Sequence, residues 1–180
     1  MNFIIYDLEA TCWRGRPPRK VQEIIEIGAL LVNDYGEVED VFSRFVRPVV
    51  SPNLSAFCEE LTSIRQEDVD RAETFDRVIE DFQDWGRIFD EDYVLCSWGK
   101  FDKRMLRQDC ELHNMEHEWV SPHINLKKQY QSIRRLRKPT GLRRTVEHEG
   151  FEFTGVHHRA IADAENLTKV FTKYLDMWQY

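Results

Sequence analysis

The segment FIIYDLEATCW, Phe3 to Trp13, joins an apolar run typical of a buried strand to two carboxylates, Asp7 and Glu9, with only Leu8 between them. Burying an isolated carboxylate is unfavourable unless something compensates its charge. Residues two apart in a strand point the same way, so Asp7 and Glu9 face one side together. Carboxylate oxygens are the ligands that Mg²⁺ and Mn²⁺ prefer, so the pair suggests a divalent-cation site, with a solvated strand end as the alternative.

Length and composition bound the class of protein. A chain of 180 residues with 42% hydrophobic content predicts one domain spanning residues 1–180. No apolar run approaches the roughly 18 residues of a membrane span, and the N-terminus lacks a signal-peptide pattern, so we expect a cytoplasmic protein without membrane association. The four cysteines are irregularly spaced without a CxxC, which favours reduced thiols over disulfides.

The charge is unevenly distributed along the chain. The net charge is −7, but eight basic residues and no acid lie between Lys127 and Arg144, and the run WRGRPPRK at 13–20 adds four more. These segments carry +12, which leaves −19 for the remainder. A local basic footprint on an acidic protein is compatible with nucleic-acid binding. A solvated helix face plus a loop is the alternative.

Hydrophobic periodicity predicts strands and helices that alternate along the chain. Strands are expected at 2–9, 23–33, 37–48 and 92–99, the second and third forming a hairpin. Helices are expected within 50–64 and at 74–89, 101–112, 124–133, 141–150 and from near 160 to Trp178. This order indicates an α/β fold in which a mixed central sheet is flanked by helices.

Two further acids and a histidine lie where helices are expected to begin. Asp102 follows a strand after only Lys100 and Phe101, at the sheet edge where open α/β sheets bind ligands. Asp163 lies in the first turns of the last helix, where the helix dipole favours any acid. His158 precedes it by five positions, about 140° around a helix, so the two side chains should not meet at one metal. His158 suits a general base, whereas polar surface is the simpler explanation and His157 is a competitor.

Three motifs together resemble a known family. DLEATCW, WGKFDKRML and HHRAIADAENL are similar, in this order, to the three exonuclease motifs of the DEDDh branch of the DnaQ-like 3′→5′ exonucleases. The phrases INLKK and FTGVHHR most resemble the Eri-type and KapD-like RNA exonuclease subgroup. The resemblance covers essentially the whole chain.

The resemblance implies an RNase H-like exonuclease fold and two Mg²⁺ ions, with Mn²⁺ as a substitute. By similarity Asp7 bridges both ions, Glu9 and Asp163 complete the first site, Asp102 holds the second mainly through water, and His158 is the general base. The implied activity is a 3′→5′ exoribonuclease that trims single-stranded or 3′-overhang RNA and releases nucleoside 5′-monophosphates.

The resemblance also implies substrate contacts. The expected apolar wall around the 3′-terminal base comprises Trp13, Phe57 and Leu61, and Thr11 is expected to contact the substrate as well. From charge alone, we expect Arg134 and Arg135 of the basic segment to contact the RNA backbone. Two departures from the family pattern are Ala162, where a second acid is frequent, and Ser63 in LTSI, where the family writes LTGI.

Other functions remain open on the sequence. A DNA exonuclease shares the same motifs, because only a 2′-hydroxyl contact separates the two substrates. Oligoribonucleases carry Tyr at the position of His158. A non-catalytic RNA-binding module should lack one of the acids or the base, and none is missing. A zinc site built on Cys110, His113 and His117 matches no established four-ligand spacing.

Overall fold

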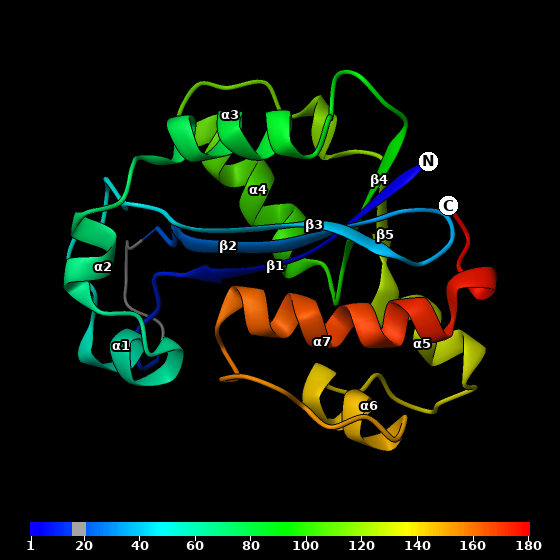
Figure 1. The fold of residues 1–180 in the computed structure, drawn as a ribbon. Coiled ribbons are helices and arrows are strands. Elements are labelled where there is room, and N and C mark those ends of the chain that lie inside the picture. Colours follow the sequence, from blue (N-terminus) through cyan, green and yellow to red (C-terminus); the bar gives the residue numbers. More distant parts are fainter. Residues whose placement is uncertain (16–20) are drawn as a thin grey trace.

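The computed structural model describes residues 1–15 and 21–180 and contains a five-stranded sheet in the order β3-β2-β1-β4-β5 (Figure 1). The strands are β1 (Asn2–Ala10), β2 (Ile24–Val32), β3 (Val38–Phe45), β4 (Tyr93–Ser97) and β5 (His123–Asn125). The first three strands pair antiparallel, whereas β4 runs parallel to β1 and β5 parallel to β4. The expected hairpin and the mixed sheet are therefore confirmed.

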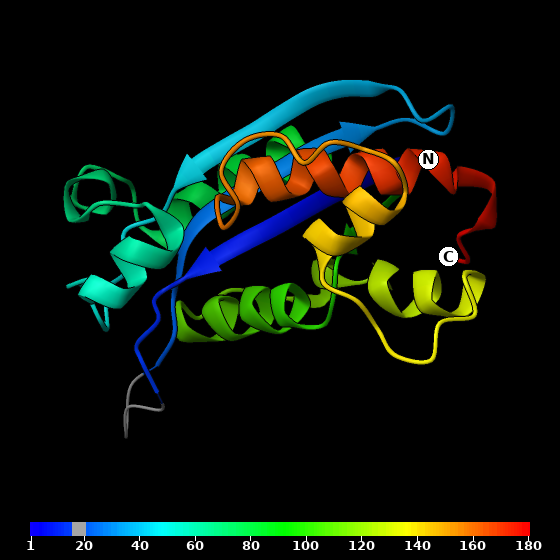
Figure 2. The ribbon, with the colours of Figure 1, turned by 90° about the horizontal axis from the view of Figure 1, so that it is seen from below.

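Helices cover both faces of this sheet. They are α1 (Ala56–Thr62), α2 (Gln66–Asp70), α3 (Phe75–Trp85), α4 (Phe101–Leu112), α5 (Leu126–Ile133), α6 (Leu142–His148) and α7 (Ala160–Lys173). Figures 1 and 2 show α3 and α4 on one face, α5, α6 and α7 on the other, and α1 with α2 beyond the end of β1. None of the helices in the described part of the chain combines the length and apolar character needed to cross a membrane.

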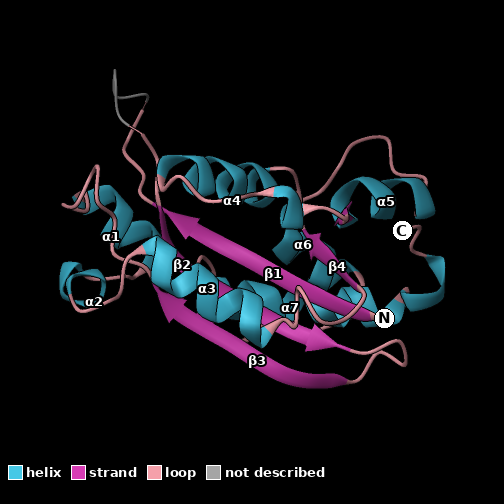
Figure 3. Cartoon of the chain, turned by 90° about the horizontal axis from the view of Figure 1, so that it is seen from above, coloured by secondary structure: helices cyan, strands magenta, loops and turns pink. Residues whose placement is uncertain are grey.

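The alternation of side chains along β1 decides which helix faces the acids. The even positions Ile4, Tyr6 and Leu8 pack in the core that includes α3 and α4. The odd positions Phe3 and Ile5 pack in the second core, which α5, α6 and α7 complete. A strand keeps this alternation along its length, so the next odd positions, 7 and 9, lie on the α7 side. Figure 3 shows β1 crossing the centre of the sheet with α7 beside it.

Two predicted helices differ from the structure in their bounds, and one observed helix was not predicted. The region after α4 forms a 3₁₀ turn (Glu118–Val120) and the short strand β5, so the helix expected from 124 begins at Leu126. The helix α2 was not predicted. The last helix ends at Lys173, whereas a helix through Trp178 was expected. A 3₁₀ turn (Leu175–Met177) folds the chain back, and Trp178 Nε1 donates to the Phe171 carbonyl at 2.9 Å, so Trp178 is buried without being helical.

Candidate active site

Three carboxylates from distant parts of the sequence meet at the end of β1. The ligand oxygens of Asp7, Glu9 and Asp163 all lie within 4.8 Å of one another. Glu9 is 8% exposed and Asp163 4%, whereas Asp7 is half-buried. The strand delivers the first two acids from one face, and the first turn of α7 delivers the third, as the alternation of β1 requires.

A glycine allows α7 to approach this closely. Gly28 pairs with Asp7 in the β1–β2 register. A Cβ at position 28 would lie 2.2 Å from the backbone nitrogen of Ile161 and 2.3 Å from the carbonyl carbon of Ala160. No side chain fits there, so Gly28 sets the distance between β2 and the start of α7, two residues before Asp163.

A buried ion pair fixes the same end of α7. Glu26 is 1% exposed and accepts hydrogen bonds from Arg159 Nε at 3.1 Å and Nη2 at 2.8 Å, and from the Ala160 backbone N–H at 2.8 Å. Such charge-assisted bonds from a planar guanidinium are directional as well as strong. Glu26 lies opposite Glu9 in the sheet, so the pair anchors the start of α7 beside the acid cluster. This pair was not predicted, because its one signal in the sequence is a Glu inside an apolar strand.

Asp102 occupies the first turn of α4, 5% exposed, next to the cluster but outside the group of three. Its helix follows β4 (Tyr93–Ser97) closely, because α4 begins at Phe101. On the same helix, Asp109 Oδ2 accepts the Ile24 N–H at 2.8 Å, which ties α4 to the start of β2. A register irregularity between Glu9 and Ala10 lies at this point, and such bulges often adjoin functional sites.

The acids oppose one another's ionisation. Burial, followed by the charges of Asp102 and Glu9, raises the pKa of Asp7 well above its usual value. Burial, followed by the charges of Asp163 and Glu26, raises the pKa of Glu9 to about 9. Burial also raises the pKa of Asp102 to about 6. In the described chain no Lys or Arg forms an ion pair with these acids. The nearby cation Arg159 pairs with Glu26 instead. An all-oxygen, anionic and buried donor set of this kind fits hard divalent cations.

The two histidines both adjoin Asp163. His157 Nδ1 lies 2.9 Å from Asp163 Oδ1, and the His158 backbone N–H donates to Oδ2 at 3.1 Å. The two rings stack with centroids 4.0 Å apart. His158 precedes α7, in a turn with φ of 63°, so the helical offset that was to separate it from Asp163 is wrong. Burial, followed by the charge of His157, lowers the pKa of His158 and favours its neutral ring at pH 7.

The predicted base-binding residues gather between the end of β1 and α1. Ser55 Oγ donates to the Cys12 carbonyl at 2.6 Å, which brings α1 against the residues that follow β1. Phe57 is half-buried with Arg14 Cζ 6.0 Å from its ring centroid, Leu61 is 37% exposed, and Trp13 is half-buried.

Two residues near this wall have structural positions of their own. Thr11 is 1% exposed, and its hydroxyl accepts a hydrogen bond from the Glu23 N–H at 2.9 Å. This bond ties the residue before β2 to the residue after β1. Ser63, the departure from LTGI, caps α1 with φ of 60°, a left-handed conformation that favours glycine. The substrate contact of Thr11 stays a prediction.

The basic segment 127–144 is less free than its sequence indicated. Arg134 Nε lies 3.4 Å from the buried carboxylate of Glu149, and Arg143 Nε donates to Glu147 at 3.1 Å. The segment therefore does have compensating acids once the chain is folded. Both acids come from α6 or its C-cap. Arg135 is exposed. Of the second basic run, Arg16, Arg19 and Lys20 lie outside the described residues.

The alternative zinc site does not form. Among the described residues, the groups able to hold a metal are Asp7 with Glu9 and Asp163, and Asp163 with the two histidines. Cys110 is buried in the core, His113 lies against Phe75, and His117 Nε2 is 3.5 Å from Glu111.

Comparisons with known proteins agree on one family. Residues 4–171 match the family described as Exonuclease (RNase_T). The human protein "3′-5′ exoribonuclease 1" is 34% identical over 95% of this chain and 51% of its own length. The Bacillus subtilis protein "Probable 3′-5′ exonuclease KapD" is 30% identical over 94% of this chain and 82% of its own. The chain thus spans about half the length of the human relative.

A solved structure gives the same answer for the fold. The nuclease domain of 3′hExo, described as a DEDDh family member bound to rAMP, superposes with a TM-score of 0.90 at 33% identity. The match covers 97% of this chain and 92% of that one. The RNase H-like exonuclease fold expected from the three motifs is therefore confirmed.

Proposed function

This chain belongs to the RNase_T exonuclease family, and on that premise we propose that it is a 3′→5′ exoribonuclease dependent on Mg²⁺, with Mn²⁺ as a substitute. The observation that carries the proposal is the convergence of Asp7, Glu9 and Asp163 within 4.8 Å. Residues 1–180 act as one domain. The four free cysteines support a reducing compartment such as the cytoplasm.

The four acids would hold a pair of divalent ions. Asp7 would hold both ions, together with Glu9 and Asp163 at the first, while Asp102 would serve the second ion from α4. When bound there, two divalent ions would supply an activated water and would stabilise the leaving 3′ oxygen. The buried carboxylates contribute by fixing the donor geometry and by presenting negative charge that only a cation relieves.

His158 acts as the general base. Its lowered pKa leaves a ring nitrogen free to accept the proton of the attacking water at neutral pH. The turn at 157–158 is held because Asp163 accepts the His158 backbone N–H, which positions the ring beside the acid cluster. His157 lies against the other oxygen of Asp163 and orients that carboxylate.

The wall of Trp13, Phe57 and Leu61 receives the 3′-terminal base. Stacking on aromatic side chains is tolerant of sequence and contributes roughly 1–3 kcal/mol per base. The predicted position of this wall, at the end of β1 and beside α1, leaves the scissile phosphate at the acids. Release of nucleoside 5′-monophosphates follows from attack at the last phosphodiester.

We propose RNA as the substrate, as single strands or 3′ overhangs. The support is the name of the human relative and the rAMP bound to the related nuclease domain. A DNA exonuclease is the second candidate, because metal-assisted attack at phosphorus does not depend on the sugar.

One assay separates these functions. Single-stranded RNA labelled at its 5′ end, the matching DNA and a stem-loop RNA with a 3′ tail are incubated with Mg²⁺, Mn²⁺ or chelator. A ladder that shortens from the 3′ end of RNA, only with metal, is expected. Intact RNA together with degraded DNA would identify DNA as the substrate. Binding of RNA without cleavage under any metal would indicate a non-catalytic RNA-binding module. The Asp7→Asn variant is the control for contaminating nuclease.

A further inference from the structure

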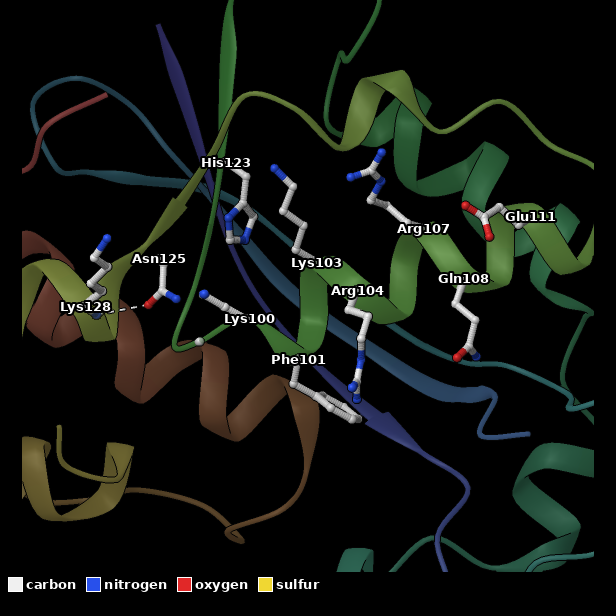
Figure 4. A pocket seen from close by; sticks show the side chains of 11 residues that line it. Lys100, Phe101, Lys103, Arg104, Arg107, Gln108, Glu111, His123, Asn125 and Lys128 are labelled. Carbon is white, nitrogen blue, oxygen red and sulfur yellow. Dashed lines mark hydrogen bonds between the residues drawn. The ribbon is translucent and has the colours of Figure 1, made fainter. Parts of the chain in front are cut away.

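A groove of about 1010 Å³ runs along α4 beside the acid site (Figure 4). One wall is α4 from Phe101 to Glu111, and the other is β5 with the start of α5. This volume is at the upper limit of the roughly 300–1,000 Å³ typical of ligand sites. The groove begins next to the metal-binding acids, since Lys100, Phe101 and Lys103 line it and flank Asp102 in the chain.

The lining of the groove is strongly basic. The cations that line it are Lys100, Lys103, Arg104, Arg107 and Lys128. The one acid in the lining, Glu111, lies 3.5 Å from His117. None of the five cations forms an ion pair with an acid of the described chain; Lys103 Nζ instead donates to Ser121 Oγ at 3.1 Å. On a chain of net charge −7, this is an unbalanced positive surface.

The spacing of the cations places them on one side of α4. Positions 100, 103 and 107 are three and four residues apart and therefore lie above one another, on successive turns 5.4 Å apart. Figure 4 shows Lys103 and Arg107 rising from this side of the helix, with Lys128 across the groove on α5. Like charges at such spacing repel.

The basic segment that the sequence favoured offers a weaker surface. Within 127–144, Arg134 and Arg143 neutralise Glu149 and Glu147, and only Lys128 lines the groove. The groove combines cations without acid partners among the described residues, a concave shape and lining residues on either side of Asp102 in the chain.

We infer that this groove binds the phosphates of the RNA strand immediately upstream of the 3′-terminal nucleotide. The inference rests on the proposed function for the direction of the strand: the 3′ end lies at the acids, and the upstream phosphates follow α4 from Lys100 towards Arg107. The phosphates relieve the repulsion among the cations, and the groove supplies the chain with a grip on long substrates.

Binding is measured without cleavage, so the test does not depend on nuclease activity. Fluorescence anisotropy in chelator gives Kd between 50 and 200 mM salt for 5′-labelled RNA of 4 and 16 nucleotides. The groove variant K103Q/R107Q/K128Q is compared with the matched loop variant R135Q/R137Q/K138Q, which removes the same charge from 127–144. Each lost phosphate contact reduces the slope of log K against log salt by about 0.7 for a single strand, so the groove variant should lose about 2.

This decrease in slope means that the groove variant loses more affinity, relative to the wild type, at low salt than at high salt. The loss at 50 mM salt should be about 18-fold larger than the loss at 200 mM salt. The loss is expected in full on the 16-mer and in part on the 4-mer, which has only two phosphates upstream of its last phosphodiester. The loop variant should keep the wild-type slope. A 16-mer of DNA should show the same loss, because phosphates and not 2′-hydroxyls are bound. A loss confined to RNA, or a reduced slope in the loop variant with an unchanged slope in the groove variant, overturns the inference.

Two controls keep the outcome interpretable. Circular dichroism melts report whether each variant folds; if the triple groove variant does not, Arg107→Gln alone should reduce the slope by about 0.7. Incubation of the wild type with Mg²⁺ is scored separately. Salt-dependent groove binding with uncut RNA would leave this inference standing and reject the proposed nuclease activity.

Discussion

Gly28→Ala should separate α7 from the acid cluster by adding one methyl group. The new Cβ would lie 2.2 Å from the Ile161 nitrogen, and ordinary van der Waals contact begins at 3.4 Å. The backbone of α7 must therefore retreat by roughly 1.2 Å at its first turn, because the obstructing atoms belong to the main chain. Asp163 moves with this turn, away from Asp7 and Glu9.

The expected effects are large on both stability and turnover. Overpacking a core site costs about 1–3 kcal/mol, which for a domain of this size lowers Tm by roughly 2–12 °C. A displacement of about 1 Å in a catalytic constellation costs on the order of a hundredfold in rate. Differential scanning calorimetry and the initial rate on 5′-labelled RNA, at a temperature where the variant is folded, measure the two effects.

Gly141→Ala is the matched control, since no atom lies within 4 Å of the added Cβ and φ is −70°. As an N-cap change it should cost no more than about 1 kcal/mol and leave turnover near that of the wild type. If Gly28→Ala kept a turnover within threefold of wild type and a Tm within about 1 °C, the claim that Gly28 sets the position of Asp163 would be refuted.

Three further predictions concern the site itself. Asp7→Asn should lower turnover on RNA at least a hundredfold, as measured at saturating Mg²⁺, and should raise Tm in chelator because it removes one of the mutually repelling acids; near-normal activity would reject the metal assignment. His158→Ala should abolish most turnover with a smaller effect on RNA binding, and activity of the wild type should fall as pH drops through the lowered pKa of His158; a greater loss for His157→Ala would assign the base to the neighbouring histidine. The folded-state pKa of Glu9 is about 9 against an ordinary 4.5, so its contribution to stability is fully present below pH 4.5 and is lost as pH rises towards 9; Tm in chelator should therefore fall from pH 5 to pH 9, Mg²⁺ should reduce the fall, and a Tm that rises over this range would contradict the electrostatics.

The sequence predicted the parts of the site that depend on local periodicity. The alternation along β1 predicted that Asp7 and Glu9 face one side, and the family motifs predicted Asp102 and Asp163 as their partners. Each of these signals is local, because it lies within a few neighbouring residues. The fold class and the α3, α4 and β1 to β4 elements followed from the same periodicities.

What was missed depends on contacts between distant segments. The Glu26–Arg159 pair joins residues 133 positions apart, and the role of Gly28 exists only once α7 crosses β2. The turn that brings His158 to Asp163 requires a positive φ at a non-glycine residue, which no propensity suggests. The basic segment looked unpaired because its partner Glu149 follows the run of cations and becomes a neighbour of Arg134 only by folding.

The split origin of the acid cluster also has a consequence for protein synthesis. Glu9 and Asp163 are separated by 154 residues, which a ribosome adds in roughly 8–30 s at about 5–20 residues per second. Until α7 emerges, the odd face of β1 has neither its third carboxylate nor its covering helix. A nascent or prematurely released chain that lacks α7 therefore cannot assemble the group of three carboxylates.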